Sequence, residues 1–268
     1  MGNQIRSGFT IIETMLVLAI SGILVAGLLF GIGNSINAQR YRDSVTSFKS
    51  YIQDQYAQLD SVQNGRTDAQ TCSGVTGVPM NESDASAVSR GQSNCVLIGR
   101  YIVINGNRAT AATVLGSGTV SSAAVNEIAA IQTGYRFGID KTSIIDDTLE
   151  WGARLSWPLD GEVPDEKKVD DSARGIRMLL IRSPVSGTTY TFTVDGTTSP
   201  AAVSSTSMKS MMTSTTQNGR VLCVAPNGFA VPERLSVMIA AFASGSNAIQ
   251  SSNNQALRDE FGAEASQC

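Results

Sequence analysis

The chain contains one long uncharged segment close to its N-terminus. After Glu13, no Asp, Glu, Lys or Arg occurs until Arg40, which leaves the 26 residues from Thr14 to Gln39 without charge. In a helix that rises ~1.5 Å per residue they extend roughly 39 Å, whereas about 20 apolar residues cross the hydrocarbon core of a bilayer. The segment therefore predicts a single membrane-spanning helix.

The residues around this segment do not fit a cleaved secretory signal. Such a signal has an apolar stretch of about 7–15 residues followed by a cleavage site of small residues. Here the apolar stretch is longer and no such site follows it. The simplest interpretation is an uncleaved signal anchor.

A second interpretation comes from the sequence GFTIIE at residues 8–13 and its apolar continuation to Leu24. This stretch resembles the type IV prepilin signature. The resemblance implies that a membrane peptidase cuts between Gly8 and Phe9 and methylates the new amine of Phe9. It also implies that Glu13 neutralises the N-terminal amine of a neighbouring subunit in a filament. A carboxylate in a membrane helix is costly and usually has a partner, although Glu13 could instead reach to the interface.

The signal departs from the family pattern at two points. Many pilins have a proline late in the apolar helix, where this chain has Phe30, and four glycines occur instead: Gly22, Gly27, Gly31 and Gly33. They are compatible with partial melting of the helix or with close helix packing, since Gly27 and Gly31 form a GxxxG spacing. The flanking charges, Arg6 before the segment and Arg40 and Arg42 after it, do not place residues 1–8 in the cytoplasm by the positive-inside rule. The cysteines and the resemblance support that orientation.

Composition argues against several function classes. The chain has no histidine, which excludes Ser-His-Asp and Cys-His catalysis and His-ligated zinc. Its formal net charge of −3 does not favour binding to nucleic acid. We therefore expect a non-enzymatic protein without a cofactor.

The four cysteines all follow the apolar segment, where an exported domain would form disulfides. Four cysteines allow three pairings. We favour Cys72–Cys95 and Cys223–Cys268 because each closes a local loop.

Apolar periodicity predicts an α+β fold. Apolar residues at three- and four-residue spacings from Tyr41 to Val62 extend the helix, which we place at Phe9–Gln63 with a stop at Asn64-Gly65. Three hairpins follow, each with turn residues between two apolar runs: Cys95–Ile104 with Arg108–Leu115, Gly175–Arg182 with Thr188–Val194, and Arg220–Ala225 with Leu235–Ala243. Short helices are expected within Val120–Thr133, Ser207–Met212 and Gln255–Phe261, and Tyr135–Leu155 is ambiguous. An antiparallel sheet should cover the second half of the helix.

Other side chains offer weaker candidates for chemistry. The acidic run from Asp160 to Asp171 has the oxygen ligands that calcium needs, with Asp160, Glu162 and Asp165 as candidates, but a solvated loop is the default because Lys167 and Lys168 interrupt it. Arg174, Arg177 and Arg182 could contact DNA, although ordinary surface arginines explain them as well. We expect Trp151 and Trp157 to lie in the core or at an interface.

The resemblance completes the functional expectation. It implies a leader at residues 1–8, a stem helix at 9–63 and an extracytoplasmic head at 64–268. It implies a minor pilin or pseudopilin, a structural subunit of a type IV pilus-like filament. The alternatives are a type II secretion or DNA-uptake (competence) pseudopilin, or a pilus-borne adhesive or DNA-binding head. The implied partners are other pilin subunits, a prepilin peptidase, an inner-membrane assembly platform and, before assembly, the membrane. The implied final location is a cell-surface pilus or a periplasmic pseudopilus.

Overall fold

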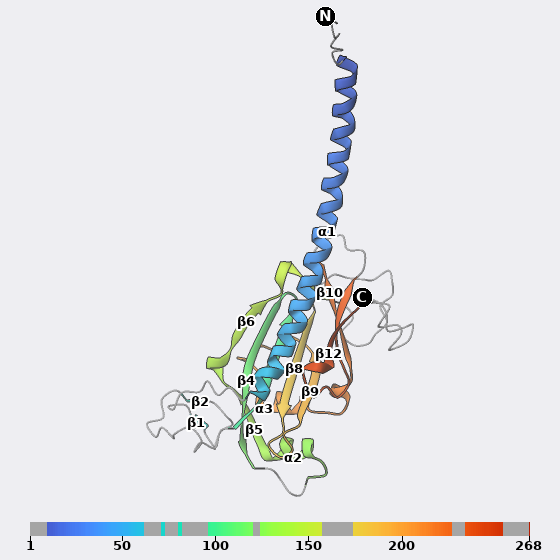
Figure 1. Ribbon diagram of the computed structural model, residues 1–268. Helices are drawn as coiled ribbons and strands as arrows, with labels where there is room; N and C mark the ends of the chain where they lie inside the picture. The colour runs from blue at the N-terminus through green and yellow to red at the C-terminus, as the bar shows by residue number, and fades with distance from the viewer. Residues whose placement is uncertain are drawn as a thin grey trace, which may run out of the picture.

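A long helix extends from one end of a β-rich head (Figure 1). The computed structural model describes residues 10–61, 71–72, 80–81, 96–119, 124–156, 174–226, 234–253 and 268. The expected α+β layout, with a long N-terminal helix and antiparallel sheets, is confirmed and fits a pilin-like fold.

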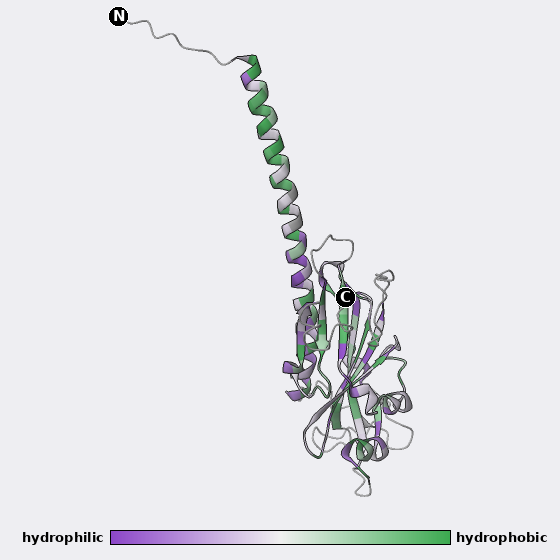
Figure 2. Cartoon of the chain, turned by 90° about the vertical axis from the view of Figure 1, so that its right-hand side faces the viewer, coloured by the Kyte–Doolittle hydropathy of each residue, from purple (hydrophilic) through white to green (hydrophobic). Residues whose placement is uncertain are grey.

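The helix α1 runs without interruption from Ile11 to Asp60. Thr10 caps its N-terminus and Ser61 its C-terminus. It is slightly shorter than the predicted Phe9–Gln63, whose outermost residues lie outside the described part of the chain. Figure 2 shows that the hydrophobic part of α1 projects away from the head, and that hydrophilic residues begin where the head begins.

The larger sheet has six antiparallel strands in the order β5-β4-β3-β8-β9, with β6 also paired to β4. The Asn105-Gly106 turn predicted between its first two strands is present, with Gly106 at a φ of 59°. The predicted hairpin around Pro184–Gly187 is also present. The strands are β3 (Val96–Asn105), β4 (Arg108–Gly118), β5 (Tyr135–Ile139), β6 (Ile145–Thr148), β8 (Gly175–Arg182) and β9 (Thr189–Asp195).

The smaller sheet has the order β12-β11-β10-β7. Its strands are β7 (Arg154–Leu155), β10 (Arg220–Ala225), β11 (Leu235–Ile239) and β12 (Ile249–Asn253), and a separate two-residue pair joins β1 (Thr71–Cys72) to β2 (Met80–Asn81). The expected pairing of β10 with β11 is correct, but β11 ends at Ile239 rather than Ala243. Sequence analysis did not predict β12.

Two short helices complete the head, α2 (Glu127–Gly134) and α3 (Ser205–Met211). Both overlap the short helices expected from the sequence. The ambiguous stretch from Tyr135 to Leu155 contains β5, β6 and β7 and two 3-10 turns, η1 (Lys141–Ser143) and η2 (Glu150–Gly152). Two further 3-10 turns are η4 (Thr215–Gln217) and η5 (Ser246–Ala248). The expected helix at Gln255–Phe261 lies outside the described residues.

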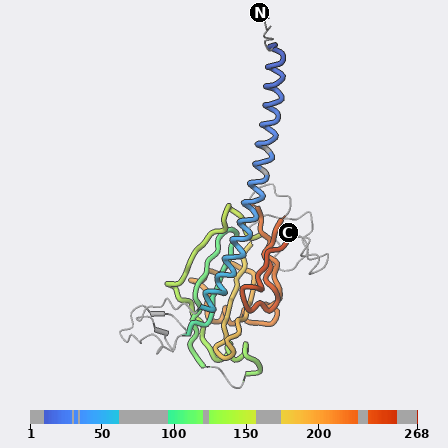
Figure 3. Tube along the Cα trace, viewed as in Figure 1, coloured from blue at the N-terminus to red at the C-terminus, as the bar shows by residue number. Residues whose placement is uncertain are grey.

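The first core lies between the lower half of α1 and both sheets. The helix runs down across the green strands of the large sheet and the orange-red strands of the small sheet (Figure 3). Its buried face recurs at three- and four-residue spacings, as an amphipathic helix requires: Tyr41, Val45, Phe48, Ile52, Tyr56 and Leu59. They contact apolar residues of both sheets, which include Ile102, Ile104, Ile176, Met178, Leu222, Val224 and Val237.

A second core lies on the opposite face of the large sheet, under α2 and α3. Alternate residues of β3 and β8 enter it, among them Tyr101, Val103, Leu179 and Ile181, and Met208 and Met211 of α3 cover them. Because both faces of these central strands are buried, β8 is apolar at successive positions, as a strand between two layers should be.

One predicted disulfide lies within the described residues. Cys223 of β10 is joined to Cys268, with their Cα atoms 5.3 Å apart. The bond ties the C-terminal residue to the small sheet. The other predicted pair, Cys72–Cys95, lies outside the residues whose side chains the structure describes.

Candidate functional site

The N-terminal end of α1 is closed by a reciprocal pair of hydrogen bonds. The Glu13 backbone N–H donates to Thr10 Oγ1 over 3.3 Å. In return, the Thr10 backbone N–H and its hydroxyl each donate to Glu13 Oε2 over 3.1 Å. This is a capping box, in which two side chains satisfy backbone groups that the first turn leaves unpaired. Glu13 therefore has a role inside its own chain that sequence analysis did not anticipate, although the Thr-x-x-Glu spacing signals it.

The other predicted residues of this site, Gly8 and Phe9, lie outside the described part of the chain. Cleavage after Gly8, methylation of Phe9 and the pairing of Glu13 with an amine therefore remain predictions. The capping box leaves Glu13 on an exposed turn.

The upper half of α1 is an exposed apolar surface. It contains an 18-residue window with a mean hydropathy of 2.6 of which none is buried against the head. By length and composition α1 is able to cross a membrane. So large an exposed apolar surface normally marks an interaction with a membrane or a protein. Its exposed side chains are Ile11, Ile12, Met15, Leu16, Val17, Leu18, Ile20, Ile23, Leu24, Val25, Leu28, Leu29, Ile32 and Ile36.

Comparison with known families identifies the start of this surface. The family model of the prokaryotic N-terminal methylation motif matches residues 4–29. The chain has a type IV prepilin-type signal. The prepilin-type signal and the apolar helix together fit a membrane-anchored pilin-like or pseudopilin subunit, and they point to a structural rather than an enzymatic role. Neither the curated proteins nor the solved structures include a match to the chain.

Where α1 enters the head, polar contacts hold it in register. The Tyr41 hydroxyl donates to the Val224 carbonyl of β10 and accepts the Leu235 N–H of β11, each over 2.7 Å. Farther along, Gln53 donates to the carbonyls of Ser246 and Ile249 at 3.0 and 3.1 Å. These bonds attach the lower half of α1 to the small sheet and to η5. They fix the orientation of the helix relative to the head.

A buried arginine attaches the same helix to the large sheet. Arg100 of β3 is only 6% exposed. Its Nε and Nη2 donate to Gln55 Oε1 at 3.1 and 2.7 Å, and its Nη1 donates to Thr113 Oγ1 at 3.0 Å. Burial lowers the pKa of Arg100 from its ordinary value. Sequence analysis missed this cluster because an arginine in a strand gives no indication of which helix face it will meet.

On the far side of the head, Glu127 joins α2 to the turn between β8 and β9. Its carboxylate accepts hydrogen bonds from the Ser183 hydroxyl, from the Ser186 N–H and hydroxyl at 3.1 Å each, and from the Tyr190 hydroxyl at 2.7 Å. These donors, Ser183 foremost, lower the pKa of Glu127 to about 2. The contact is structural, since it holds a short helix against a hairpin.

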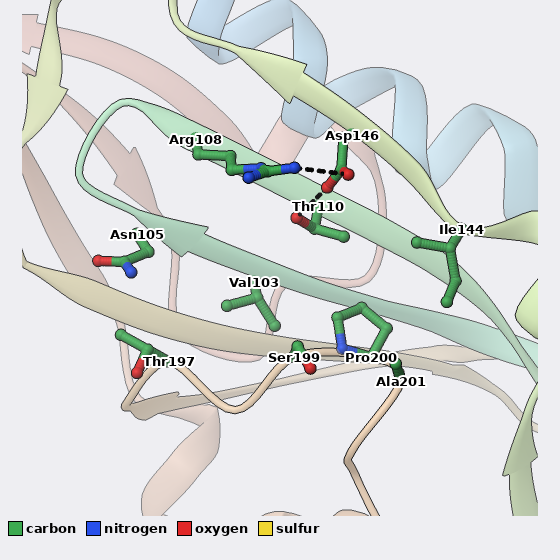
Figure 4. A pocket seen from close by; sticks show the side chains of 10 residues that line it. All are labelled: Val103, Asn105, Arg108, Thr110, Ile144, Asp146, Thr197, Ser199, Pro200 and Ala201. Atoms are coloured by element: carbon green, nitrogen blue, oxygen red, sulfur yellow. Dashed lines mark hydrogen bonds and ion pairs between the residues drawn. The ribbon is translucent and has the colours of Figure 1, made fainter.

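An open groove of about 370 Å³ lies on the large sheet beside the β3–β4 turn (Figure 4). Val103, Thr110 and Arg108 line it from the sheet, and Pro200 lines it from the segment after β9. Asp146 of β6 accepts hydrogen bonds from Arg108 at 2.8 Å and from Thr110 at 2.6 Å. The groove therefore presents a neutralised cation, not a free positive charge.

The remaining candidates do not form a described site. The calcium candidates Asp160, Glu162 and Asp165 lie outside the described residues, and within those residues no cluster of three or more His, Cys, Asp or Glu could hold a metal ion. Arg177 donates to the Asp195 carbonyl and Arg182 to the Asp60 carbonyl, so both arginines form hydrogen bonds within the chain.

The tryptophans were expected in the core or at an interface. Trp151 is 51% exposed, so a core position is wrong for it. The turn η2 places its side chain outward beside α1. Trp157 lies outside the described residues.

Proposed function

We propose that this protein is a minor pilin or pseudopilin, a structural subunit of a type IV pilus-like filament. A prepilin peptidase cuts after Gly8, and an inner-membrane platform moves the processed chain from the bilayer into the filament. One observation supports this proposal above the others. The prepilin-type signal begins a helix whose apolar half is entirely unburied, so that it can pass from lipid to the apolar surfaces of other helices.

The head supports a minor subunit or pseudopilin rather than the bulk subunit. Among the residues that the structure describes, it has a core on each face of the large sheet, which makes it a large head for a filament subunit. The choice between pilus, type II secretion and DNA uptake follows from neighbouring genes. A secretion ATPase with an outer-membrane channel supports secretion, whereas a retraction ATPase with competence genes supports a pilus or DNA uptake.

The capping box allows the assembly role of Glu13 to be tested separately from its role in the helix end. Glu13→Gln retains an acceptor for the Thr10 N–H but removes the charge. Thr10→Ala removes the hydroxyl half of the box and retains the charge. Glu13→Ala removes the charge and the carboxylate half, and leaves the Thr10 hydroxyl to cap the backbone N–H of residue 13.

If Glu13 pairs with an amine of a neighbouring subunit, Glu13→Gln and Glu13→Ala should reduce filament incorporation by about tenfold or more, equivalent to about 1.4 kcal/mol. Thr10→Ala should assemble nearly normally. The measurement is the amount of subunit in sheared filaments, with mass spectrometry of the N-terminus to verify cleavage after Gly8 in every variant. Normal incorporation of Glu13→Gln would contradict the charge pairing, and a chain that still begins at Met1 would contradict the processing.

A further inference from the structure

Trp151 has an unusual backbone for a bulky residue. It lies in η2 with φ at 55° and ψ at 21°, in the left-handed region that large side chains seldom adopt. Even so, the residue is 51% exposed instead of entering either core. Strained residues of this kind often mark a functional surface, which makes the location of Trp151 informative.

The indole lies where the apolar half of α1 ends. Ser44 of α1 donates to the Glu150 carbonyl at 2.9 Å and so holds η2 against the helix. The guanidinium carbon of Arg40 lies 4.9 Å from the centroid of the Trp151 ring. Arg40 is the first charged residue after the uncharged segment. These contacts place Trp151 beside the residue at which the uncharged segment ends. Figure 2 shows the hydrophobic part of α1 leaving one end of the head.

The length of the uncharged segment places this pair at the membrane surface. From Glu13 to Arg40 the helix rises about 40 Å, and a bilayer measures about 30 Å across its hydrocarbon core and about 40–45 Å with its headgroups. When Glu13 lies in the headgroup layer on one side of the bilayer, Arg40 therefore reaches the headgroup layer on the other side. Tryptophan favours that layer because its ring is apolar and its N–H is polar.

We propose that Trp151 and Arg40 form a lipid-contacting surface that seats the head on the phospholipid headgroups around α1 before assembly. The indole enters the interface, while the stacked guanidinium donates to lipid phosphate. The occupant is the lipid surface because this patch is continuous with the membrane-spanning half of the same helix. The charges of Arg40 and Arg42 are balanced by those of the exposed Asp43 and Glu150. The contact therefore depends on the Trp151 and Arg40 side chains rather than on the net charge of the surface.

Phe242 supplies a matched control position. It is the other described non-glycine residue with positive φ, at 55°, and it is 66% exposed. It lies in the turn between β11 and η5, and η5 contacts Gln53. Gln53 is 13 residues beyond Arg40, or about 20 Å farther from the membrane along the helix. An indole at position 242 should therefore remain in water.

The test is fluorescence quenching in the full chain reconstituted into vesicles of phosphatidylethanolamine and phosphatidylglycerol. Some of the lipids bear a nitroxide on the headgroup. The chain has two tryptophans, so Trp157→Phe leaves Trp151 as the only emitter. The control combines Trp151→Phe, Trp157→Phe and Phe242→Trp. We expect the headgroup label to quench Trp151 at least about twofold more than the control indole. Arg40→Gln in the Trp157→Phe background should reduce that difference.

Two results would overturn the inference, and they are distinguishable. The inference depends on the membrane insertion that the proposed function requires. Chain that does not float with the vesicles would contradict membrane insertion itself, and with it this contact and the proposed function. Chain that floats while Trp151 is quenched no more than the control indole would contradict the lipid contact alone.

Discussion

The two halves of α1 form one continuous helix in two different surroundings. From Ile11 to Ile36 the described side chains are exposed and, apart from Glu13, Thr14, Ser21 and Ser35, apolar, and the apolar window is not buried against the head. From Tyr41 to Leu59 one face is buried against two sheets while the opposite face is polar. The comparison shows that helix continuity and helix environment are determined separately. Local propensity maintains the helix, and the distribution of apolar side chains selects lipid, other helices or the head as its partner.

The largest expected effect separates the two halves by burial. Ile52 is fully buried against the sheets, whereas Ile23 is 73% exposed. Ile52→Ala should lower the free energy of unfolding of the head by about 2–5 kcal/mol because it leaves a cavity. The same change at Ile23 should leave it unchanged. Urea unfolding of the full chain in detergent micelles, followed by near-UV circular dichroism, measures both. Similar losses from the two variants would show that the halves are energetically coupled.

The second effect concerns the polar contact in the buried half. Gln55→Leu removes the acceptor of two Arg100 donors and leaves a buried cation poorly paired. The free energy of unfolding should fall by about 1–3 kcal/mol.

Adding Arg100→Met in the same chain should recover part of that loss, because the buried cation and its amide acceptor are then both absent and only the Thr113 hydroxyl has lost a partner. The comparison of single and double variants in urea requires no other control. Additive losses would mean that Arg100 and Gln55 stabilise the head independently.

The smallest effect uses pH to distinguish the halves. Between Glu13 and Arg40 the sequence has no charged side chain, so this segment contributes no pH dependence to stability. The hydrogen bonds that hold the pKa of Glu127 at about 2, below its ordinary 4.5, favour the ionised form in the folded state. That stabilisation is present above pH 4.5 and is lost as the pH falls towards 2.

Glu127→Gln should lower the free energy of unfolding at pH 7 by about 1 kcal/mol, a modest value because the site is partly exposed. It should also flatten the decline in stability between pH 4.5 and 2. Urea midpoints at several pH values for both chains measure this. An unchanged pH slope would assign the decline to other carboxylates.

Several strands were predictable because their signals are local. The Asn-Gly turn after β3 and the Pro-to-Gly turn after β8 each lie between two apolar runs, and both hairpins formed as expected. In contrast, β12 has a largely polar sequence, IQSSN, and exists because β11 offers it a partner edge. The end of β11 was placed too far along because Ala240 to Ala243 is apolar. A turn that holds Phe242 at positive φ separates this stretch from the strand.

The candidate site divides in the same way. The prepilin-type signal was recognisable because it is a contiguous sequence. The roles of Gly8, Phe9 and Glu13 in processing and assembly stay predictions. The capping role of Glu13 was also readable from its spacing to Thr10, but it was overlooked. Arg100, Glu127 and Trp151 were not recognisable in these roles, since each acquires its partner from a segment distant in the chain.

The sequence by itself determined that an uncharged segment long enough for a bilayer follows a prepilin-type signal. It also determined that an amphipathic helix and several hairpins come after it. Each of these properties depends on side chains within a few residues of one another. Only the tertiary structure decided that the lower half of α1 packs against two sheets and that Arg100 binds Gln55. It also decided that Trp151 lies beside Arg40, where the apolar half of α1 ends. Those contacts join residues 45 to more than 100 positions apart, and no local preference of the chain specifies which distant surfaces will meet.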